Sequence, residues 1–412
     1  MLASFVMEGA ASRKKRRVKL TNNYKGWCNQ TGSRLWLERI NAQCISPKQF
    51  YNRYIRRRMP VILVSPNTDC LRAFSILNLT RIAGDCRVAV EKADSESYQA
   101  FGRADAGSRR KMKFADFLNR MCEDELYCST QPVPEDRRGP KVLASPHVQR
   151  LISRGLIPEQ LPLMGNLTLH QINTWIGCSE DGTSSGFHHD FHDNFYMLLA
   201  GEKQFRISSP NFTEEDPTYG CGAGSRVVVH ENGLISYEGK AIRDDGARKE
   251  DVIEWKISKN PSNVEQLRDD LQEQILSDAM DRRPNSCTYP PSFCRQPTAH
   301  GEYLTETIKA GEMLYLPAGF FHEVISFNTP ETTTHHMAVN YWYYPPRVDG
   351  TFEQPYLDDF WKERWERLAM KSLNRVRLNR DRMRRNKLPL QFQYTKKEIL
   401  RFIRRLELRK RQ

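Results

Sequence analysis

A long series of short apolar segments separated by turns narrows the possible folds more than any other part of the sequence. The segments lie between about residues 167 and 344 and read LTLHQINTWIG, SGFHHDF, NFYMLLAG, KQFRISS, SRVVVHE, LISYEG, ETIKAGEMLYLP, HEVISF and HMAVNYWYY. Eight or nine short strands at such close spacing are typical of an all-β sandwich or barrel. A polar helix pattern and a proline-rich stretch interrupt the series between about 244 and 300.

The remaining segments place further structure around this predicted barrel. Residues 1–24 read as a disordered basic arm. Residues 25–165 read as an α/β part that packs on the barrel, because helix-like and strand-like patterns such as SPKQFYNRYIRR and MPVILVS alternate there. The barrel occupies residues 166–350, and residues 351–412 read as a basic helical tail. We therefore expect a mainly β protein with flanking helices.

Charge is distributed unevenly along the 412 residues, whose formal net charge is +13. Residues 361–412 contain 19 Lys/Arg and 5 Asp/Glu, and residues 1–25 contain 7 and 1, so the part between them is net acidic. Basic ends indicate an anionic partner such as nucleic acid or a ribosome, while a solvated helical tail is the alternative. The amphipathic pattern of 395–412 is equally compatible with docking on the body, a dimer partner or a polyanion.

Cysteine use and the N-terminus bear on the cellular compartment. The ten cysteines include no C-x-x-C pair and no secretory signal is evident, so we expect reduced thiols in a nuclear or cytoplasmic protein that is not secreted. The cluster SRKKRRVK favours nuclear import, and a mitochondrial presequence stays open because residues 1–25 contain one acid. No apolar run is long enough for a membrane span. Cys287, Cys294 and His300 match no common zinc spacing and are interpreted as structural.

The stretch GFHHDFH, residues 186–192, concentrates potential metal ligands. In an extended strand His188 and Asp190 project from the same face, so they can hold adjacent coordination positions of one metal. An H-x-D tripeptide alone is weak evidence, but His322, between two strand-like segments in LPAGFFHEV, is a candidate third ligand. Two imidazoles and one carboxylate form the facial triad of non-haem Fe(II) oxygenases. The other polar residues of the stretch are interpreted as bystanders: His189, His192 and Asp193.

Three stretches carry a family resemblance: INTWIGCSEDGTSSGFHHDFHDNFYMLLAGEKQF, AGEMLYLPAGFFHEV and MAVNYWYYPP. They resemble the JmjC (cupin-like) class of Fe(II)- and 2-oxoglutarate-dependent oxygenases, and within it the small hydroxylase branch that includes JmjC-domain-containing protein seven. The resemblance covers about residues 34–360. The insertion, the basic tail and the basic arm depart from the branch and leave the substrate open. The resemblance implies a double-stranded β-helix, a jelly roll of the cupin type, with Fe(II), 2-oxoglutarate and O2 as cofactor and cosubstrates.

The resemblance also implies roles for individual residues. His188, Asp190 and His322 are expected to bind iron, and Lys203 to pair with the distal carboxylate of 2-oxoglutarate. A dianion in an apolar barrel needs a cation and hydroxyl donors, which agrees with this role. The alternative for Lys203 is a hairpin lysine in solvent. Further cosubstrate contacts are expected from five residues: Ser185, Tyr196, Asn194, Asn340 and Tyr127.

For this class the resemblance implies decarboxylation of 2-oxoglutarate to succinate and CO2, coupled to oxidation of a C–H bond. We expect a protein side-chain hydroxylase acting on lysine or arginine, with a histone or protein N-methyl-lysine or N-methyl-arginine demethylase as the alternative. A hypothesis of another class is a catalytically silent JmjC scaffold that binds nucleic acid or ribosomes through residues 361–412. The complete set of iron ligands argues against it. A homodimer through the helical tail is suggested by analogy alone.

Overall fold

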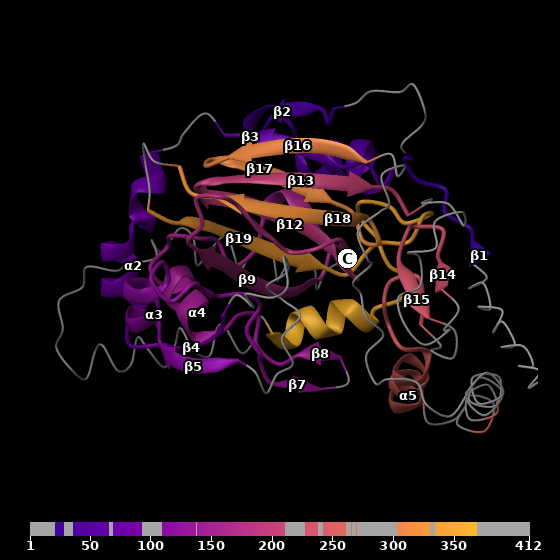
Figure 1. Ribbon diagram of the computed structural model, residues 1–412. Coiled ribbons are helices and arrows are strands. Elements are labelled where there is room, and N and C mark those ends of the chain that lie inside the picture. Colours follow the sequence, from indigo (N-terminus) through magenta and orange to yellow (C-terminus); the bar gives the residue numbers. More distant parts are fainter. Residues whose placement is uncertain are drawn as a thin grey trace, which may run out of the picture.

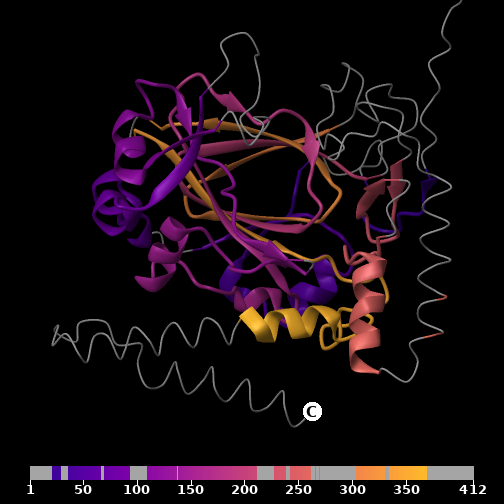
Figure 2. The same ribbon diagram turned by 90° about the horizontal axis from the view of Figure 1, so that it is seen from below.

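The computed structural model of the chain describes most of residues 21–368. The described ranges are 21–28, 36–65, 69–92, 109–136, 138–210, 227–237, 242–260, 303–329 and 334–368, together with positions 265 and 269. Two β-sheets face each other and form a barrel-like sandwich, and the described helices lie outside it (Figure 1, Figure 2). The predictions of a mainly β protein with flanking helices and of a jelly-roll fold are therefore confirmed.

The larger sheet of the barrel has six strands in the order β2-β3-β17-β12-β19-β9. Their bounds are β2 Arg39–Asn41, β3 Val61–Val64, β17 Glu312–Leu316, β12 Asp193–Ala200, β19 His336–Tyr343 and β9 Leu169–Gly177. β2 and β3 run parallel, and all other neighbours in this sheet are antiparallel. The strand β12 is therefore central, with β17 on one side and β19 on the other.

The smaller sheet has five strands, in the order β10-β18-β13-β16, with β11 also paired to β18. Their bounds are β10 Thr183–Ser184, β18 Phe321–Phe327, β13 Glu202–Ser208, β16 Leu304–Lys309 and β11 His188–His189. β11 is short, but its antiparallel pairing with β18 places His188 directly opposite His322. The smaller sheet thus brings together two residues that are far apart in the sequence.

Alternating side chains of β12 pack into two different hydrophobic cores, one between the two sheets and one on the outer side of the larger sheet. Tyr196 and Leu198 face the interior between the sheets, where they pack with Phe205 of β13. Phe195 faces the outer side, where the ring of Phe50 packs against it with centroids 6.3 Å apart. Because both faces of β12 are buried, its sequence reads as an almost continuous apolar run.

Short helices and small sheets of the N-terminal part pack against the outer side of the larger sheet. Their bounds are η1 Ala42–Cys44, α1 Pro47–Phe50, η2 Tyr51–Ile55, η3 Asp69–Phe74, α2 Ile76–Ala83, β4 Arg87–Lys92, β5 Arg110–Lys113, α3 Phe114–Arg120, β6 Leu126–Tyr127, β7 Glu135–Asp136, β8 Gly139–Pro140, α4 Pro146–Ser153 and η4 Pro162–Met164. α1 begins with a capping box in which Ser46 and Gln49 exchange hydrogen bonds. No helix in the described part of the chain is long and apolar enough to cross a membrane.

Two segments that we expected in the barrel form a separate sheet. β14 Val227–Val229 pairs with β15 Ile235–Tyr237 and, in parallel, with β1 Thr21–Asn22. The barrel strands are consequently interrupted from 209 to 303, and not only near 244–300. β1 also lies within the segment that we predicted to be a disordered arm. Its partner is about 200 residues away in the sequence, so no local pattern could reveal the pairing; residues 1–20 lie outside the described residues.

The insertion contains the helix α5, Lys249–Lys259. The indole of Trp255 in α5 donates a hydrogen bond to Glu363 at 2.9 Å and packs edge-on against Phe360, so α5 docks on the segment that follows the barrel. The polar helix that we expected at 263–280 lies outside the described residues, apart from positions 265 and 269, which are helical.

The first turns of the predicted basic tail are part of the folded body. Residues 360–368 are helical, and Trp361 and Leu368 are buried in the outer core. Arg364 has no exposed surface, because its guanidinium donates to backbone oxygens that include those of Leu169 and Arg138. Arg364 is therefore unavailable to a polyanion. Residues 369–412 lie outside the described residues, and the expectation of an anionic partner stays a prediction for them.

The structure corrects the expectation that all cysteines are reduced. Cys122 and Cys178 form a disulfide. They are 56 residues apart in the sequence, and the fold places their Cα atoms 5.0 Å apart. The spacing of the cysteines along the chain gives no sign of this pairing. The other described cysteines are not part of a disulfide: Cys28, Cys44, Cys86 and Cys128.

Candidate metal centre and cosubstrate pocket

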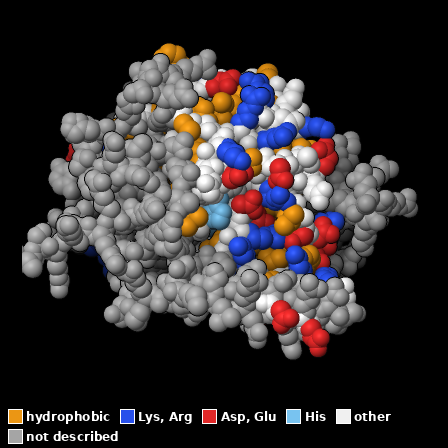
Figure 3. Space-filling view, turned by 90° about the vertical axis from the view of Figure 1, so that its right-hand side faces the viewer, with side chains coloured by type: hydrophobic (Ala, Val, Ile, Leu, Met, Phe, Trp, Pro, Cys, Tyr) orange, Lys and Arg blue, Asp and Glu red, His pale blue; other side chains and the backbone are white. Residues whose placement is uncertain are grey.

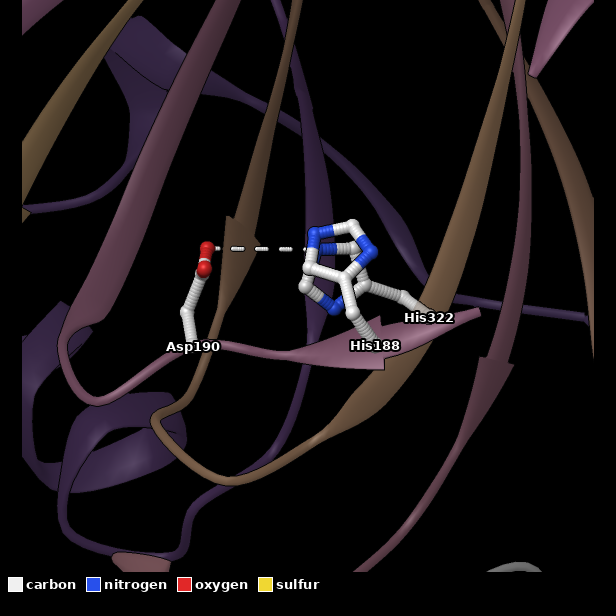
Figure 4. Close-up of side chains that lie close together, drawn as sticks. All are labelled: His188, Asp190 and His322. Carbon is white, nitrogen blue, oxygen red and sulfur yellow. Dashed lines mark ion pairs between the residues drawn. The ribbon is translucent and has the colours of Figure 1, made fainter. Parts of the chain in front are cut away.

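Three side chains converge where β11 pairs with β18. His188 lies on β11, Asp190 follows β11 directly, and His322 lies on β18 (Figure 4). One ligand atom from each residue lies within 4.8 Å of the others, and the Nε2 atom of His322 is 3.9 Å from a carboxylate oxygen of Asp190. This is the predicted two-histidine, one-carboxylate group, and among the described residues it is the only such group of three or more potential ligands.

Backbone carbonyls orient both imidazoles of this group. The Nδ1 atom of His188 lies 2.8 Å from the oxygen of Gly186, and the Nδ1 atom of His322 lies 3.0 Å from the oxygen of Phe320. Because a carbonyl only accepts hydrogen bonds, each Nδ1 must carry the proton, which leaves Nε2 free to bind a metal. Burial, with a smaller contribution from His188, lowers the pKa of His322 to about 4, so this imidazole is neutral at pH 7 as a ligand must be.

A chain of side-chain amides holds the carboxylate of Asp190. The amide of Asn194 donates to Asp190 at 3.4 Å, and the amide of Asn340 donates to the Asn194 oxygen at 3.0 Å. The indole of Trp175 completes the chain by donating to Asn340 at 3.0 Å. Asn194 and Asn340 were predicted as cosubstrate contacts; Asn194 lines the cavity and contacts Asp190 directly, whereas Asn340 contacts Asp190 only through Asn194.

The prediction that Asp193 is a bystander needs correction. Its carboxylate is completely buried and accepts hydrogen bonds from the guanidinium of Arg58, from Tyr315 at 2.8 Å and from the backbone N–H of Ala318 at 3.0 Å. The last bond fixes the turn that leads into β18 and His322. Asp193 is thus a structural anchor of the metal centre, and no local sequence pattern indicates a partner 135 residues away.

The two other histidines of the stretch lie outside the ligand group. The ring of His189 is buried and packs edge-on against Phe321 at 5.3 Å. The ring of His192 stacks on His170, with centroids 3.9 Å apart, and on Trp342. Both rings therefore pack against aromatic neighbours and do not point at Asp190 and His322 as ligands.

Lys203 lies behind Ser326 and Tyr127, two residues that line the cavity beside the metal ligands. Its side chain has no exposed surface, and its ammonium group lies 2.6 Å from the hydroxyl of Ser326, 3.3 Å from Nδ1 of His336 and 3.5 Å from the hydroxyl of Tyr127. No carboxylate of the described residues forms an ion pair with it. Burial alone lowers the pKa of Lys203 from 10.5 to about 7. The solvent-exposed alternative for this lysine is excluded, and the geometry leaves a buried cation facing neutral partners.

A cavity of about 50 Å³ connects the two sets of residues. It is lined by Tyr127, Trp175, Thr183, Ser184, Ser185, His188, Asp190, Asn194, Tyr196, Phe205, His322, Val324 and Ser326. Tyr196 and Tyr127, both expected here, contribute their rings. Ser185 also lines the cavity, but its hydroxyl accepts from the N–H of Val324 and donates to the oxygen of Gly186. Its hydrogen-bonding capacity is therefore directed mainly at the backbone.

Several residues in and around this pocket were not predicted from the sequence, among them Ser326, His336 and Trp175. Ser326 could have been found, because it follows His322 by four positions on one strand and so shares its face. His336 and Trp175 lie on β19 and β9, and no spacing relative to the H-x-D stretch indicates them.

The residues present fit an Fe(II) ion and a dicarboxylate. Two neutral imidazoles and a carboxylate are a donor set that suits non-haem Fe(II) and leaves coordination positions open. The buried ammonium of Lys203, flanked by two hydroxyl groups, suits the far carboxylate of an anion in the cavity. An ammonium buried without a counter-ion is costly, so such an anion would complete the pocket.

Comparisons with known proteins agree with this geometry. The JmjC domain-containing protein 4 of Schizosaccharomyces pombe is 29% identical over 441 aligned positions, which cover 82% of this chain and 90% of that protein. The lysine-specific demethylase JMJ32 of Arabidopsis thaliana is 28% identical over 179 positions, covering 42% of this chain and 41% of the relative. The human bifunctional peptidase and (3S)-lysyl hydroxylase JMJD7 is 25% identical over 214 positions, covering 48% of this chain and 52% of the relative.

The family assignment rests on a match to a family model that spans most of the chain. The cupin-like domain family matches residues 47–349, which include both sheets of the barrel and all three members of the ligand group. The resemblance to JmjC proteins is likewise confirmed by the relatives. The chain therefore belongs to the cupin-like domain family and is a JmjC protein within it.

Proposed function

We propose that this protein is an Fe(II)- and 2-oxoglutarate-dependent dioxygenase that hydroxylates a protein side chain, with lysine and arginine as the first candidates. The observation that carries the proposal is one cavity that is lined by the His188, Asp190 and His322 group and, through Ser326 and Tyr127, adjoins the buried Lys203. A metal site alone would fit many proteins. A buried cation beside the same cavity, with no counter-ion among the described residues, specifically favours a dicarboxylate cosubstrate.

The division of labour among the residues follows from their positions. His188, Asp190 and His322 would hold Fe(II), which when bound supplies the oxidising chemistry with O2 and 2-oxoglutarate and releases succinate and CO2. Lys203, with Ser326 and Tyr127, would bind the far carboxylate of 2-oxoglutarate.

Other side chains hold these groups in place. Asn194 and Asn340 fix the rotamer of Asp190, so the ligand group is preorganised before anything binds. The rings of Tyr196 and Phe205 line the cavity at 5.3 Å from each other and exclude water around the cosubstrate.

The main alternative is demethylation of an N-methyl group on lysine or arginine. It has support from the relative JMJ32, whose name is that of a lysine-specific demethylase, whereas JMJD7 is named a lysyl hydroxylase. The two activities use the same protein groups and differ in the carbon that is presented. A hydroxylated N-methyl group decomposes to formaldehyde, while a hydroxylated side-chain carbon remains on the product. Formaldehyde release with methylated and unmethylated peptides therefore separates the two.

The first test of the proposal avoids the unknown substrate. 2-Oxoglutarate is added anaerobically to the Fe(II)-loaded protein, and the visible charge-transfer band of the chelate is recorded. We expect a band for the wild type, no band for Asp190→Ala, and an unchanged band for Asp181→Ala, a matched change at an exposed aspartate outside the ligand group. A folded, iron-loaded wild type without the band would contradict the proposal and favour a silent scaffold.

A further inference from the structure

A second and larger hollow lies on the surface, outside the cosubstrate cavity. It encloses about 710 Å³ and is lined by Lys25, Gly26, Trp27, Asn52, Arg56, Arg57, Met59 and Val348. We call it the basic pocket, because three of these residues are cations and none carries a carboxylate. Its lining comes from the segment after β1, from the end of η2 and from the segment after β19.

Two arginines of the basic pocket have their charge available. Arg56 and Arg57 are exposed, and neither forms an ion pair or a side-chain hydrogen bond with any described residue. Lys25, in contrast, is bound to Glu231 at 2.8 Å. The nearest carboxylate next to Val348 is that of Asp349, which pairs with Arg347 at 2.7 Å. The pocket therefore keeps a positive charge that no acidic side chain in the described part of the chain neutralises.

The basic pocket lies at the end of the barrel that holds the metal ligands. The ring of Trp27 stacks on Phe320, with centroids 6.1 Å apart and planes at 16°. The carbonyl of Phe320 is the same one that orients the imidazole of His322. The backbone N–H of Trp27 also donates to the oxygen of Arg57 at 3.2 Å, which ties the two sides of the pocket together. Phe320 precedes the ligand His322 by two positions, so only a short stretch of buried chain separates the basic pocket from the metal centre.

We propose that the basic pocket binds an acidic segment of the protein substrate, a few residues from the side chain that is modified. The inference rests on the proposed function for its choice of a protein partner. Two adjacent guanidinium groups match carboxylates, with which arginine forms paired hydrogen bonds. The pocket selects substrates, because an acidic residue at the right distance would hold the target side chain over the metal centre.

The surroundings favour a peptide over a nucleic acid. Single-stranded nucleic acids need a basic track with successive aromatic platforms, and the pocket offers one ring, that of Trp27. Figure 3 shows one face of the molecule, on whose described part acidic and basic side chains are interspersed. The described part of that face presents no continuous field of one sign such as a long polyanion would require.

The test measures binding of a fluorescein-labelled twelve-residue peptide rich in glutamate to the full-length protein by fluorescence anisotropy. We expect binding that weakens as salt is added, since the arginines are exposed. Arg56→Glu with Arg57→Glu should weaken it at least tenfold, and the milder Arg56→Gln with Arg57→Gln should weaken it less. The matched control is Arg110→Glu with Lys111→Glu, a double reversal at two adjacent exposed cations of β5, which should change the affinity less than twofold.

Three outcomes would overturn the proposal. The first is equal binding of the glutamate peptide and its glutamine counterpart. The second is an equal loss in the pocket variant and the β5 control. The third is tighter binding of a single-stranded RNA of the same length, if that binding is abolished when Arg56 and Arg57 are replaced. Asp190→Ala should lose the 2-oxoglutarate chelate band but keep the peptide, while the arginine variants should keep the band. Failure of the oxygenase proposal and failure of the docking proposal are therefore distinguishable.

Discussion

Arg58 and Lys203 are both cations that the fold buries almost completely, yet their surroundings are opposite. Arg58, 1% exposed, faces the carboxylate of Asp193, with Tyr315 bound to the same group. Lys203, 0% exposed, faces two hydroxyl groups and an imidazole. Burial lowers the pKa of Arg58, but Asp193 more than offsets this and holds the pKa above its usual range. Nothing offsets burial at Lys203, whose pKa falls to about 7.

The difference separates a structural charge from a functional one. The fold itself completes the site of Arg58, which anchors the turn beside the metal ligands. On the proposed function, a ligand that brings a negative charge would complete the site of Lys203. Buried charges that lack a counter-ion are costly and are typical of binding sites. The cost of burying the ammonium group of Lys203 therefore supports a role in ligand binding.

The largest effect is expected from Arg58→Met. The change leaves the carboxylate of Asp193 buried and without its cation, and the free energy of unfolding should fall by about 3–5 kcal/mol. Denaturation by urea, followed by circular dichroism, measures it. Adding Asp193→Asn to Arg58→Met should recover part of the loss, because the stranded charge is removed. If Asp193→Asn instead lowered the free energy of unfolding of Arg58→Met by about another 3–5 kcal/mol, the two residues would not be energetically coupled.

Replacing the other buried cation with methionine should leave stability intact and weaken ligand binding instead. Lys203→Met removes an uncompensated charge, so the stability of the free protein should stay the same or rise. The affinity for 2-oxoglutarate should fall about a hundredfold, or roughly 3 kcal/mol, because the far carboxylate loses its cation. Titration of the anaerobic chelate band measures this. Lys309→Met, at a largely exposed lysine of the adjacent strand β16, is the control and should change neither quantity. If Lys203→Met were less stable but bound 2-oxoglutarate normally, Lys203 would be a structural cation like Arg58.

The low pKa of Lys203 predicts that both the stability of the protein and its affinity for 2-oxoglutarate depend on pH. This is the third largest effect that we expect. Between about pH 7 and 10.5 the folded free protein holds fewer protons than the unfolded chain, so its stability should rise with pH through that window. Bound 2-oxoglutarate stabilises the ammonium form, and binding must therefore take up a proton above pH 7. The affinity should fall about fiftyfold from pH 7 to pH 9. Calorimetry of the Mn(II)-loaded protein in buffers of different ionisation enthalpy measures the uptake. The affinity of Lys203→Met should be nearly independent of pH, and a wild type with the same flat profile would refute the assignment.

Much of the metal centre could be predicted because two of its three ligands lie close together in the sequence. His188 and Asp190 are two positions apart on an extended segment, and the period of a strand puts them on one face. His322 was a candidate third ligand because it lies between two strand-like segments, and the resemblance to JmjC proteins added support. Ser326 was within reach of the same period-two argument, counted onward from His322.

The remaining features depend on contacts between distant parts of the chain. Arg58 and Asp193 are 135 residues apart, and Cys122 and Cys178 are 56 residues apart. In each case the fold, and no local pattern, creates the pair. The strand β14 was misplaced for the same reason, since its apolar run fits a barrel strand as well as it fits pairing with β1. Sequence patterns indicate which face of a strand is buried, but not which distant segment buries it.

The smallest expected effect tests the amide chain that supports Asp190. Asn340 and Asn173 are cross-strand neighbours on β19 and β9, and so lie on the same face of the larger sheet. Asn340 accepts from Trp175 and donates to Asn194, whereas no hydrogen bond of the described residues satisfies the buried amide of Asn173. Asn340→Ala should therefore loosen Asp190 and weaken metal binding about tenfold, the lower end of what supporting contacts contribute. Asn173→Ala should leave metal affinity unchanged. Titration with Mn(II) measures both, and equal losses would show that the sheet as a whole, and not the amide chain, positions the carboxylate.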